Sequence, residues 1–162
     1  MRILGFIALG VALIAIALLV VGQMGLLRGK APNGLGVKDG RMKPPARTPN
    51  SVSSQADLYP DHPQRQFARI DPIRLIGEPD KAMVRIAAIL QATEGAAIVT
   101  SEPDYIYAQC TTRLLKFTDD IEFWLDRNAG VIQVRSASRL GQKDFDVNRK
   151  RVEAIRAQFN SN

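Results

Sequence analysis

The feature that most constrains this chain is its uncharged opening. Residues 3–27 carry no Asp, Glu, Lys or Arg, and Gln23 is their only strongly polar side chain. At ~1.5 Å per residue, about 20 such residues in a helix cross a hydrocarbon core of ~30 Å. We therefore predict a transmembrane anchor over residues 1–27. A cleaved signal peptide, with Arg2 as its charged n-region, is the competing interpretation, although the apolar core of such a peptide normally runs for only about 7–15 residues.

The positive charge is concentrated directly after this opening. The formal net charge is +6, and residues 28–47 carry six Lys or Arg against Asp39 alone. From residue 48 onward, Lys and Arg number 15, and Asp and Glu also number 15. Because a nucleic-acid groove needs clustered cations on the folded domain itself, we expect no nucleic-acid partner. The lone Cys110 cannot form a disulfide within the chain.

The composition divides the chain into three parts. Residues 28–48 are rich in Gly, Pro and cations and poor in large apolar side chains, which predicts a flexible basic tether. Residues 49–162 are long enough for one soluble domain. Cations on the C-terminal side of the anchor favour a cytoplasmic domain, yet the same cations could instead adsorb to anionic headgroups of the bilayer, which is the partner we expect.

Apolar spacing predicts one helix and a short strand early in the domain. Pro79 suits a first helical turn, and apolar residues follow at three- and four-residue spacing, which indicates a helix over about 79–92. Before it, apolar residues between 70 and 76 predict a strand that Pro72 interrupts or places at a sheet edge.

Alternation of apolar and polar residues predicts the main sheet. Residues 96–101 form a strand, and alternation follows around 105–114, 120–126 and 131–135. A loop at 127–130 fixes the register of the last hairpin, which pairs Leu125 with Ile132, Phe123 with Val134 and Glu122 with Arg135. The same reasoning pairs Cys110 with Phe123, Thr112 with Ile121 and Arg113 with Asp120 in the hairpin before it.

A second helix is predicted to close the domain. Gly141 allows a sharp turn, Asp144 or Asp146 can cap the helix, and Val152, Ile155 and Phe159 supply its buried side. Asn148 points inward, so it needs hydrogen-bond partners, and Ser136 and Ser138 are the nearest candidates. The fold expected is α+β: a transmembrane helix, then a curved antiparallel sheet packed on two helices in the order β-α-β-β-β-β-α.

The second face of this sheet is polar. A solvated face with exposed ion pairs is the simpler interpretation. The alternative is a partly covered face, on which arginines would be fixed donors for a bound carboxylate or phosphate. The side chains expected there are Tyr107, Arg113, Asp120, Glu122, Trp124, Arg135 and Arg139.

Four ordered motifs carry a resemblance over about residues 49–160. They are Pro-Asn-x-Val-Ser-Ser-Gln at 49–55, Phe-Thr-Asp-Asp-Ile-Glu-Phe at 117–123, Arg-Ser-Ala-Ser-Arg at 135–139 and Asp-Phe-Asp-Val-Asn-Arg at 144–149. The chain resembles domain-of-unknown-function family 1499, mostly bacterial, membrane-associated proteins without an assigned reaction. Its motifs usually have Cys where this chain has Ser51 and Gly where it has Asp146. Motif positions of unknown role are Asn50, Ser53, Ser54, Asp119, Asp120, Glu122 and Asp144.

No residue pattern predicts a reaction centre. His62 is the only histidine and sits in a proline-flanked loop, so a zinc site of the His and Cys type is excluded by count. Asp119 and Asp120 point to opposite sheet faces, which disfavours a shared cation. We predict no catalytic residue, metal or cofactor, and we favour a non-enzymatic domain over an enzyme.

The favoured function is binding of a small amphipathic or anionic ligand or of a partner protein. Its motivation is a group of polar side chains expected to converge at the end of the last strand. Two alternatives are a hydrolase that uses a serine of the 51–54 loop and a scaffold of a membrane assembly. The ligand-binding residues predicted are Arg135, Ser136, Ser138, Arg139, Asn148 and Arg149.

Overall fold

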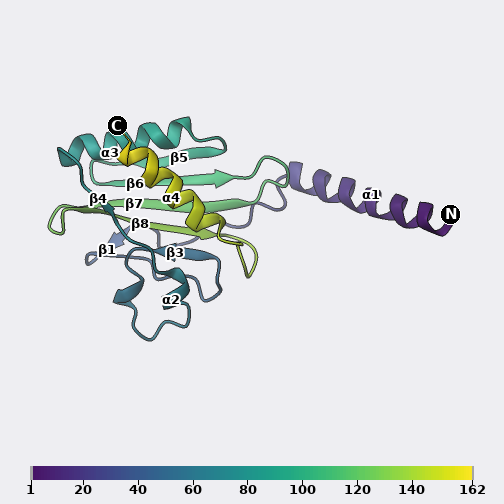
Figure 1. The fold of residues 1–162 in the computed structure, drawn as a ribbon, viewed down its shortest axis with the longest axis horizontal. Coiled ribbons are helices and arrows are strands. Elements are labelled where there is room, and N and C mark those ends of the chain that lie inside the picture. The colour runs from purple at the N-terminus through teal and green to yellow at the C-terminus, as the bar shows by residue number, and fades with distance from the viewer. Residues whose placement is uncertain (1, 162) are drawn as a thin grey trace.

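The computed structural model describes residues 2–161, and it begins with one long helix. This helix, α1 (Arg2–Gln23), has 22 residues and projects away from the rest of the chain (Figure 1). By length and composition it could cross a membrane as an anchor, and a signal sequence near the N-terminus would pass the same test.

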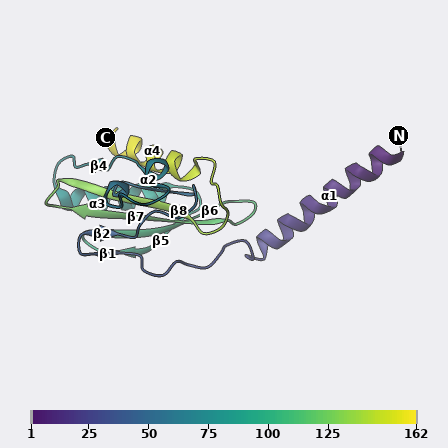
Figure 2. The ribbon, with the colours of Figure 1, turned by 90° about the horizontal axis from the view of Figure 1, so that it is seen from below.

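The remainder is built on a six-stranded antiparallel sheet. Its order is β3-β8-β7-β6-β5, and β4 pairs with β8 on the same side as β3. The strands are β3 (Ser51–Ser53), β4 (Ile73–Arg74), β5 (Ala96–Ser101), β6 (Tyr105–Thr111), β7 (Thr118–Asp126) and β8 (Val131–Ser138). Helices α3 (Pro79–Ala92) and α4 (Val147–Asn160) pack on this sheet, which confirms the predicted α+β fold (Figures 1 and 2).

The two helices form because their apolar residues recur on one side. In α3 the buried residues include Met83, Ile86 and Leu90, and the helix begins at Pro79 as its spacing predicts. In α4 they include Ile155 and Phe159, which join the same apolar core. The sheet contributes its alternating apolar residues to this core, chiefly Ala108, Ile121, Phe123, Leu125, Ile132 and Val134. Burial of this apolar surface is the main term that holds the domain together.

One of the two predicted registers is confirmed and the other is wrong. The β7–β8 hairpin pairs Glu122 with Arg135 and Phe123 with Val134, as predicted. In the β6–β7 hairpin, however, Phe123 pairs with Ile106 rather than with Cys110. The loop between these strands covers residues 112–117, so Thr112 and Arg113 lie outside the ladder. The shift is an even number of residues, and it therefore leaves every side chain on its predicted face.

The structure contains several short elements that the sequence did not predict. They are a hairpin of β1 (Val37–Lys38) and β2 (Arg41–Met42), the strand β3, a 3-10 turn η1 (Ala56–Leu58) and the short helix α2 (Arg65–Ala68). The β1–β2 hairpin lies on the sheet face opposite α4 (Figure 2). We call residues 36–46 the cover segment. These residues belong to the tether predicted over 28–48, yet some of them pack on the domain. That the tether is flexible stays a prediction.

Helix α1 meets the domain at one end of the sheet. The Gln23 side chain donates a hydrogen bond to the Leu114 carbonyl at 2.9 Å. A Cβ on Gly22 would lie 2.8 Å from the Leu115 Cα, so only glycine permits this close approach. We call this end of the sheet, with the 112–117 loop and the 139–146 loop, the anchor end. The β5–β6 and β7–β8 turns lie at the opposite end, the far end (Figure 1).

Candidate functional site

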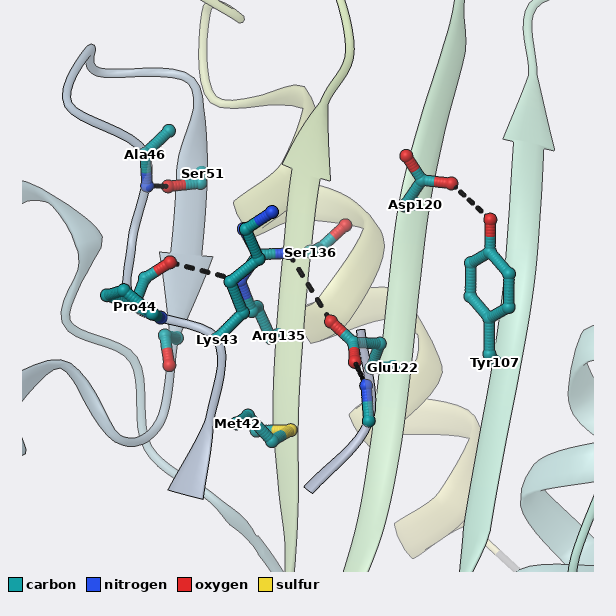
Figure 3. A network of polar contacts seen from close by, with 12 residues as sticks. Met42, Lys43, Pro44, Ala46, Ser51, Tyr107, Asp120, Glu122, Arg135 and Ser136 are labelled. Carbon is teal, nitrogen blue, oxygen red and sulfur yellow. Dashed lines mark hydrogen bonds and ion pairs between the residues drawn. The ribbon is translucent and has the colours of Figure 1, made fainter. Parts of the chain in front are cut away.

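Glu122 and Arg135 face each other across β7 and β8, beneath the cover segment (Figure 3). Glu122 is fully buried, and its Oε1 accepts hydrogen bonds from the Gly36 N–H and the Tyr105 hydroxyl, both at 2.8 Å. Its Oε2 lies 3.4 Å from Arg135 Nη1, and Arg135 Nε donates to the Pro44 carbonyl. Burial and then the Glu122 charge raise the pKa of Tyr105. Arg135 is therefore buried and already paired.

Asp120 and Arg139 form a second buried pair on the same face. Arg139 donates from Nε to Asp120 Oδ2 at 2.8 Å and from Nη2 to Oδ1 at 2.7 Å, which is the two-pronged geometry that guanidinium and carboxylate favour. The Tyr107 hydroxyl donates to Asp120 Oδ1 at 2.6 Å (Figure 3). Burial first and then this hydrogen bond raise the pKa of Tyr107, while hydrogen bonding to Asp120 raises the pKa of Arg139. Arg139 is thus committed to Asp120.

The first family motif holds the cover segment in place. The Gln55 side chain accepts the Met42 N–H at 2.8 Å and donates to the Gly40 carbonyl at 2.9 Å. Ser51 Oγ accepts the Ala46 N–H at 2.8 Å (Figure 3). Of the two interpretations of this sheet face, the partly covered one is correct, because the cover segment bonds to Glu122 and Arg135 through Gly36 and Pro44.

Asn148 is the centre of a separate network between α4 and the sheet. Its side chain donates to Ser138 Oγ at 2.9 Å and to Asp144 Oδ2, and its Oδ1 accepts the Ser136 hydroxyl. It also donates to the Asn50 carbonyl at 3.2 Å. The predicted inward position and serine partners of Asn148 are confirmed. Of the two candidate caps, Asp144 is correct, since its Oδ2 accepts the Asn148 N–H, whereas Asp146 makes no side-chain cap.

The sheet separates the six predicted ligand-binding residues. Arg135 and Arg139 point to the covered face, whereas Ser136, Ser138 and Asn148 meet beneath α4. The reason is that neighbouring residues of β8 point to opposite faces. The sixth, Arg149, lies apart and donates to backbone carbonyls of residues 67 and 69.

The other motif positions also have structural partners. Asp119 accepts from Arg151 Nη2 at 2.6 Å on the helix side of the sheet, so it diverges from Asp120 as predicted. Asn50 donates to the Gly141 carbonyl at 2.7 Å. Ser53 Oγ accepts the Gln55 N–H, and Ser54 hydrogen-bonds to Gln133 and the backbone of residue 134.

The structure reveals a basic hollow at the anchor end that the sequence did not predict. Its volume is about 580 Å³, and its lining includes three cations, Arg113, Lys116 and Arg151, against one acid, Glu94. It is further lined by Thr93, Gly95, Cys110, Thr111 and Thr112. We name it the basic hollow. The Arg151 side chain is only 14% exposed and is paired with Asp119, so it differs from an ordinary solvated charge on a helix.

The arrangement of Arg151 is suited to hold one face of an anion. Its Nη1 donates to Asn148 Oδ1 at 2.9 Å and to Ser136 Oγ at 3.3 Å, and its Nη2 donates to Asp119. These bonds fix the guanidinium at the wall of the basic hollow. One sequence signal pointed there: Arg151 follows the inward-facing Asn148 by three residues, and so lies on the same side of the helix.

Neither a metal-binding cluster nor a hydrogen-bonded serine–histidine pair is described in residues 2–161. No cluster of three or more His, Cys, Asp or Glu that could hold a metal occurs among the described residues. The hydrogen bonds described for the hydroxyls of residues 51, 53 and 54 join them to backbone groups and to Gln133, and none joins them to His62. Burial raises the pKa of the Cys110 thiol, which keeps it protonated and weakly nucleophilic.

Comparison with known proteins gives one match. A family model described as "Protein of unknown function (DUF1499)" matches residues 41–159. No curated protein and no solved structure matches the chain. The match begins inside the cover segment, eight residues earlier than the resemblance seen in the sequence.

Proposed function

The chain belongs to the DUF1499 family, and we propose that it is a membrane-anchored protein whose domain binds a small anionic ligand in the basic hollow. In this proposal α1 is the anchor and is retained in the mature protein. The ligand presents a phosphate or carboxylate, either free or as the acid group of an amphipathic molecule. The function is binding, without a reaction catalysed by the chain.

The observation that carries the proposal is the gathering of cations around one hollow. Arg113, Lys116 and Arg151 outnumber Glu94 on its walls. The volume of about 580 Å³ lies within the range of pockets that enclose small ligands. Arg151 is pre-positioned by its bonds to Asp119 and Asn148, so little side-chain freedom is lost when it meets an anion.

Arg113 and Lys116, the more exposed cations of the basic hollow, would supply the remaining contacts to the ligand. Arg113 is exposed and Lys116 is partly exposed, so both can turn toward a ligand without breaking a buried contact. Guanidinium binds phosphate or carboxylate through two parallel hydrogen bonds, and ammonium adds a compact charge. Arg135, Arg139 and Arg151 are all paired with buried carboxylates, but of the three only Arg151 lines the basic hollow.

Native mass spectrometry of the full chain, purified in detergent from the cells that make it, tests the proposal. The comparison is between the natural chain and the double variant Arg113→Gln/Lys116→Gln. A matched control is Lys81→Gln/Arg127→Gln, which removes two exposed cations away from the basic hollow. We expect a bound anionic molecule on the natural chain and on the control, and its loss from the double variant.

Three results would contradict the proposal. Bare protein masses in all three samples would exclude a stably bound ligand. A ligand that persists in the double variant would move the site elsewhere. A co-purifying protein with no small molecule would favour the alternative of a scaffold in a membrane assembly.

A further inference from the structure

The anchor end of the domain exposes an unusual number of large apolar side chains. They come from the segment after α1, from the 112–117 loop, from the segment that leads into α4 and from the first residue of α4. The seven are Met24, Leu26, Leu114, Phe117, Leu140, Phe145 and Val147. Scattered exposed apolar residues are normal, but a gathering on one end marks a surface that meets another apolar phase.

Phe145 is the most informative of these residues. Its side chain is 83% exposed, and its φ of 50° lies in the left-handed region, which is rare for a bulky residue. The next residue, Asp146, also has a positive φ of 63°. Two successive left-handed residues turn the chain so that an aromatic ring points away from the domain. Backbone conformations of this kind persist mainly where they serve a function.

Cations surround the apolar side chains. Arg28, Arg113, Lys116 and Lys143 lie on the same segments, whereas the exposed acids at this end, Glu94 and Asp146, are fewer. A third acid, Asp144, is buried. Apolar side chains with a rim of Lys and Arg are the pattern of proteins that lie in the interface of an anionic bilayer.

Contacts between α1 and the domain place this surface next to the end of the membrane-spanning candidate helix. Gln23, the last residue of α1, donates to the Leu114 carbonyl, and Gly22 lies directly against the Leu115 backbone. Farther along, a Cβ on Gly29 would lie 2.8 Å from the Arg139 Cβ, so the chain leaving α1 passes the 139–146 loop. An α1 of 22 residues is about 33 Å long at ~1.5 Å per residue, which matches a hydrocarbon core of ~30 Å. The 112–117 loop and the 139–146 loop lie at the domain end of α1 (Figures 1 and 2). If α1 spans the bilayer, both loops therefore lie at the bilayer surface.

We propose that the anchor end of the domain docks on the bilayer, with Leu114 and Phe145 inserted among the lipid headgroups. The domain is then held against the membrane rather than suspended from a loose tether. This inference rests on the proposed retention of α1 as an anchor, but it does not require a ligand in the basic hollow. The occupant of the surface is a bilayer that contains anionic lipid.

Lipid-dependent fluorescence quenching of the full chain tests the docking. The protein carries Cys110→Ala, so that single cysteines at 114, 145, 84 or 14 can be labelled with a small fluorophore. It is reconstituted in vesicles of phosphatidylcholine and phosphatidylglycerol, with or without lipids that carry a spin label near the headgroup or at mid-chain. Val84 is the matched control, because it is 70% exposed but lies on α3 in a hollow with Glu102 and Pro103 of the far end. Ile14, in the middle of α1, reports the anchor itself.

We expect at least twofold quenching at 114 and 145 by the shallow spin label, none at 84, and twofold or greater quenching at 14 by the mid-chain label. Quenching at 14 with 114 and 145 as bright as 84 would overturn the docking and leave the anchor intact. No quenching at 14 would overturn the docking together with the anchor on which it rests. Quenching at 114 alone would also refute it, since a loop next to α1 could touch lipid without the domain docking.

Discussion

Removing Arg139 tests whether the buried ion pairs on this face of the sheet are part of the scaffold. Arg139→Gln would leave Asp120, whose side chain is 2% exposed, without its two-pronged partner, while Tyr107 still donates to it. Breaking a buried pair by removing one partner typically costs about 3–5 kcal/mol, because an uncompensated charge stays buried. That is a large part of the ~5–15 kcal/mol by which domains are normally stable.

Urea unfolding of the full chain in detergent micelles measures this cost. Trp124 is the only tryptophan and lies half-buried on β7, so its fluorescence reports the sheet. With an m value of about 2 kcal/mol/M, a loss of 4 kcal/mol lowers the urea midpoint by about 2 M. The control is Arg127→Gln, which breaks the exposed pair with Asp80 and should cost no more than about 1 kcal/mol.

A double variant separates the buried charge from lost packing. Asp120→Asn/Arg139→Gln removes both charges, so it should recover much of the stability that Arg139→Gln loses. If Arg139→Gln unfolds at the same urea concentration as Arg127→Gln, the reasoning is refuted and Arg139 becomes free to serve a ligand.

Three further predictions concern other groups of the domain. Asn148→Ala should lower the free energy of unfolding by about 2–3 kcal/mol, because the Ser136 hydroxyl loses its acceptor and Arg151 Nη1 loses its shorter hydrogen bond. Asn160→Ala, at an exposed position of the same helix, should change it little, and equal midpoints for the two in urea would contradict this. The pKa values of Tyr105 and Tyr107 are raised above 10.0 in the folded state, so above pH 10 the folded chain binds more protons than the unfolded chain. The free energy of unfolding should therefore fall as the pH rises beyond 10. A urea midpoint that falls as steeply between pH 9 and pH 11 in Tyr105→Phe as in the natural chain would count against that assignment. Cys110 should react with a thiol reagent at pH 8 at least tenfold more slowly in the folded chain than in urea, because burial raises its pKa; similar rates in an absorbance assay would show that the thiol is accessible.

Periodic patterns in the sequence predicted the elements that bury an apolar side. The helix at Pro79–Ala92 and the strand at Ala96–Ser101 have the predicted bounds, because a repeated spacing fixes which side of each faces the core. The β6–β7 register was wrong because a slip by an even number of residues preserves the faces. Alternation alone cannot detect such a slip, and the six-residue loop from 112 to 117 carries no turn signal that fixes its length.

The cover segment could not be predicted by the same means. It is held by contacts between residues far apart in the sequence, such as the Gly36 N–H with Glu122. Its composition is that of a tether, and only isolated residues such as Met42 are buried. When the cover segment is not foreseen, the opposite charges on β7 and β8 favour the interpretation of a solvated sheet face.

The candidate site was missed for a related reason. The alternation placed Arg113 in the predicted strand, whereas it lies in the 112–117 loop. Lys116, in the same loop, has a positive φ of 58° and belongs to no periodic pattern. Their meeting with Arg151 depends on the end of β6 lying beside the start of α4, which is a property of the tertiary fold. The predicted cluster around Ser136, Ser138 and Asn148 does meet, but as an internal network behind the wall of the basic hollow.

The measurement that tests the central claim most directly is a titration of the full chain with inorganic phosphate, followed by NMR in bicelles. Binding in the basic hollow predicts saturable shifts at the amides of Gly95, Thr112 and Arg113 and at the Arg151 side-chain N–H, all of which should vanish in Arg113→Gln/Lys116→Gln. Shifts that centre instead on Arg135 and Arg139, or no shift at 10 mM phosphate, would contradict the claim that this hollow is the anion-binding site.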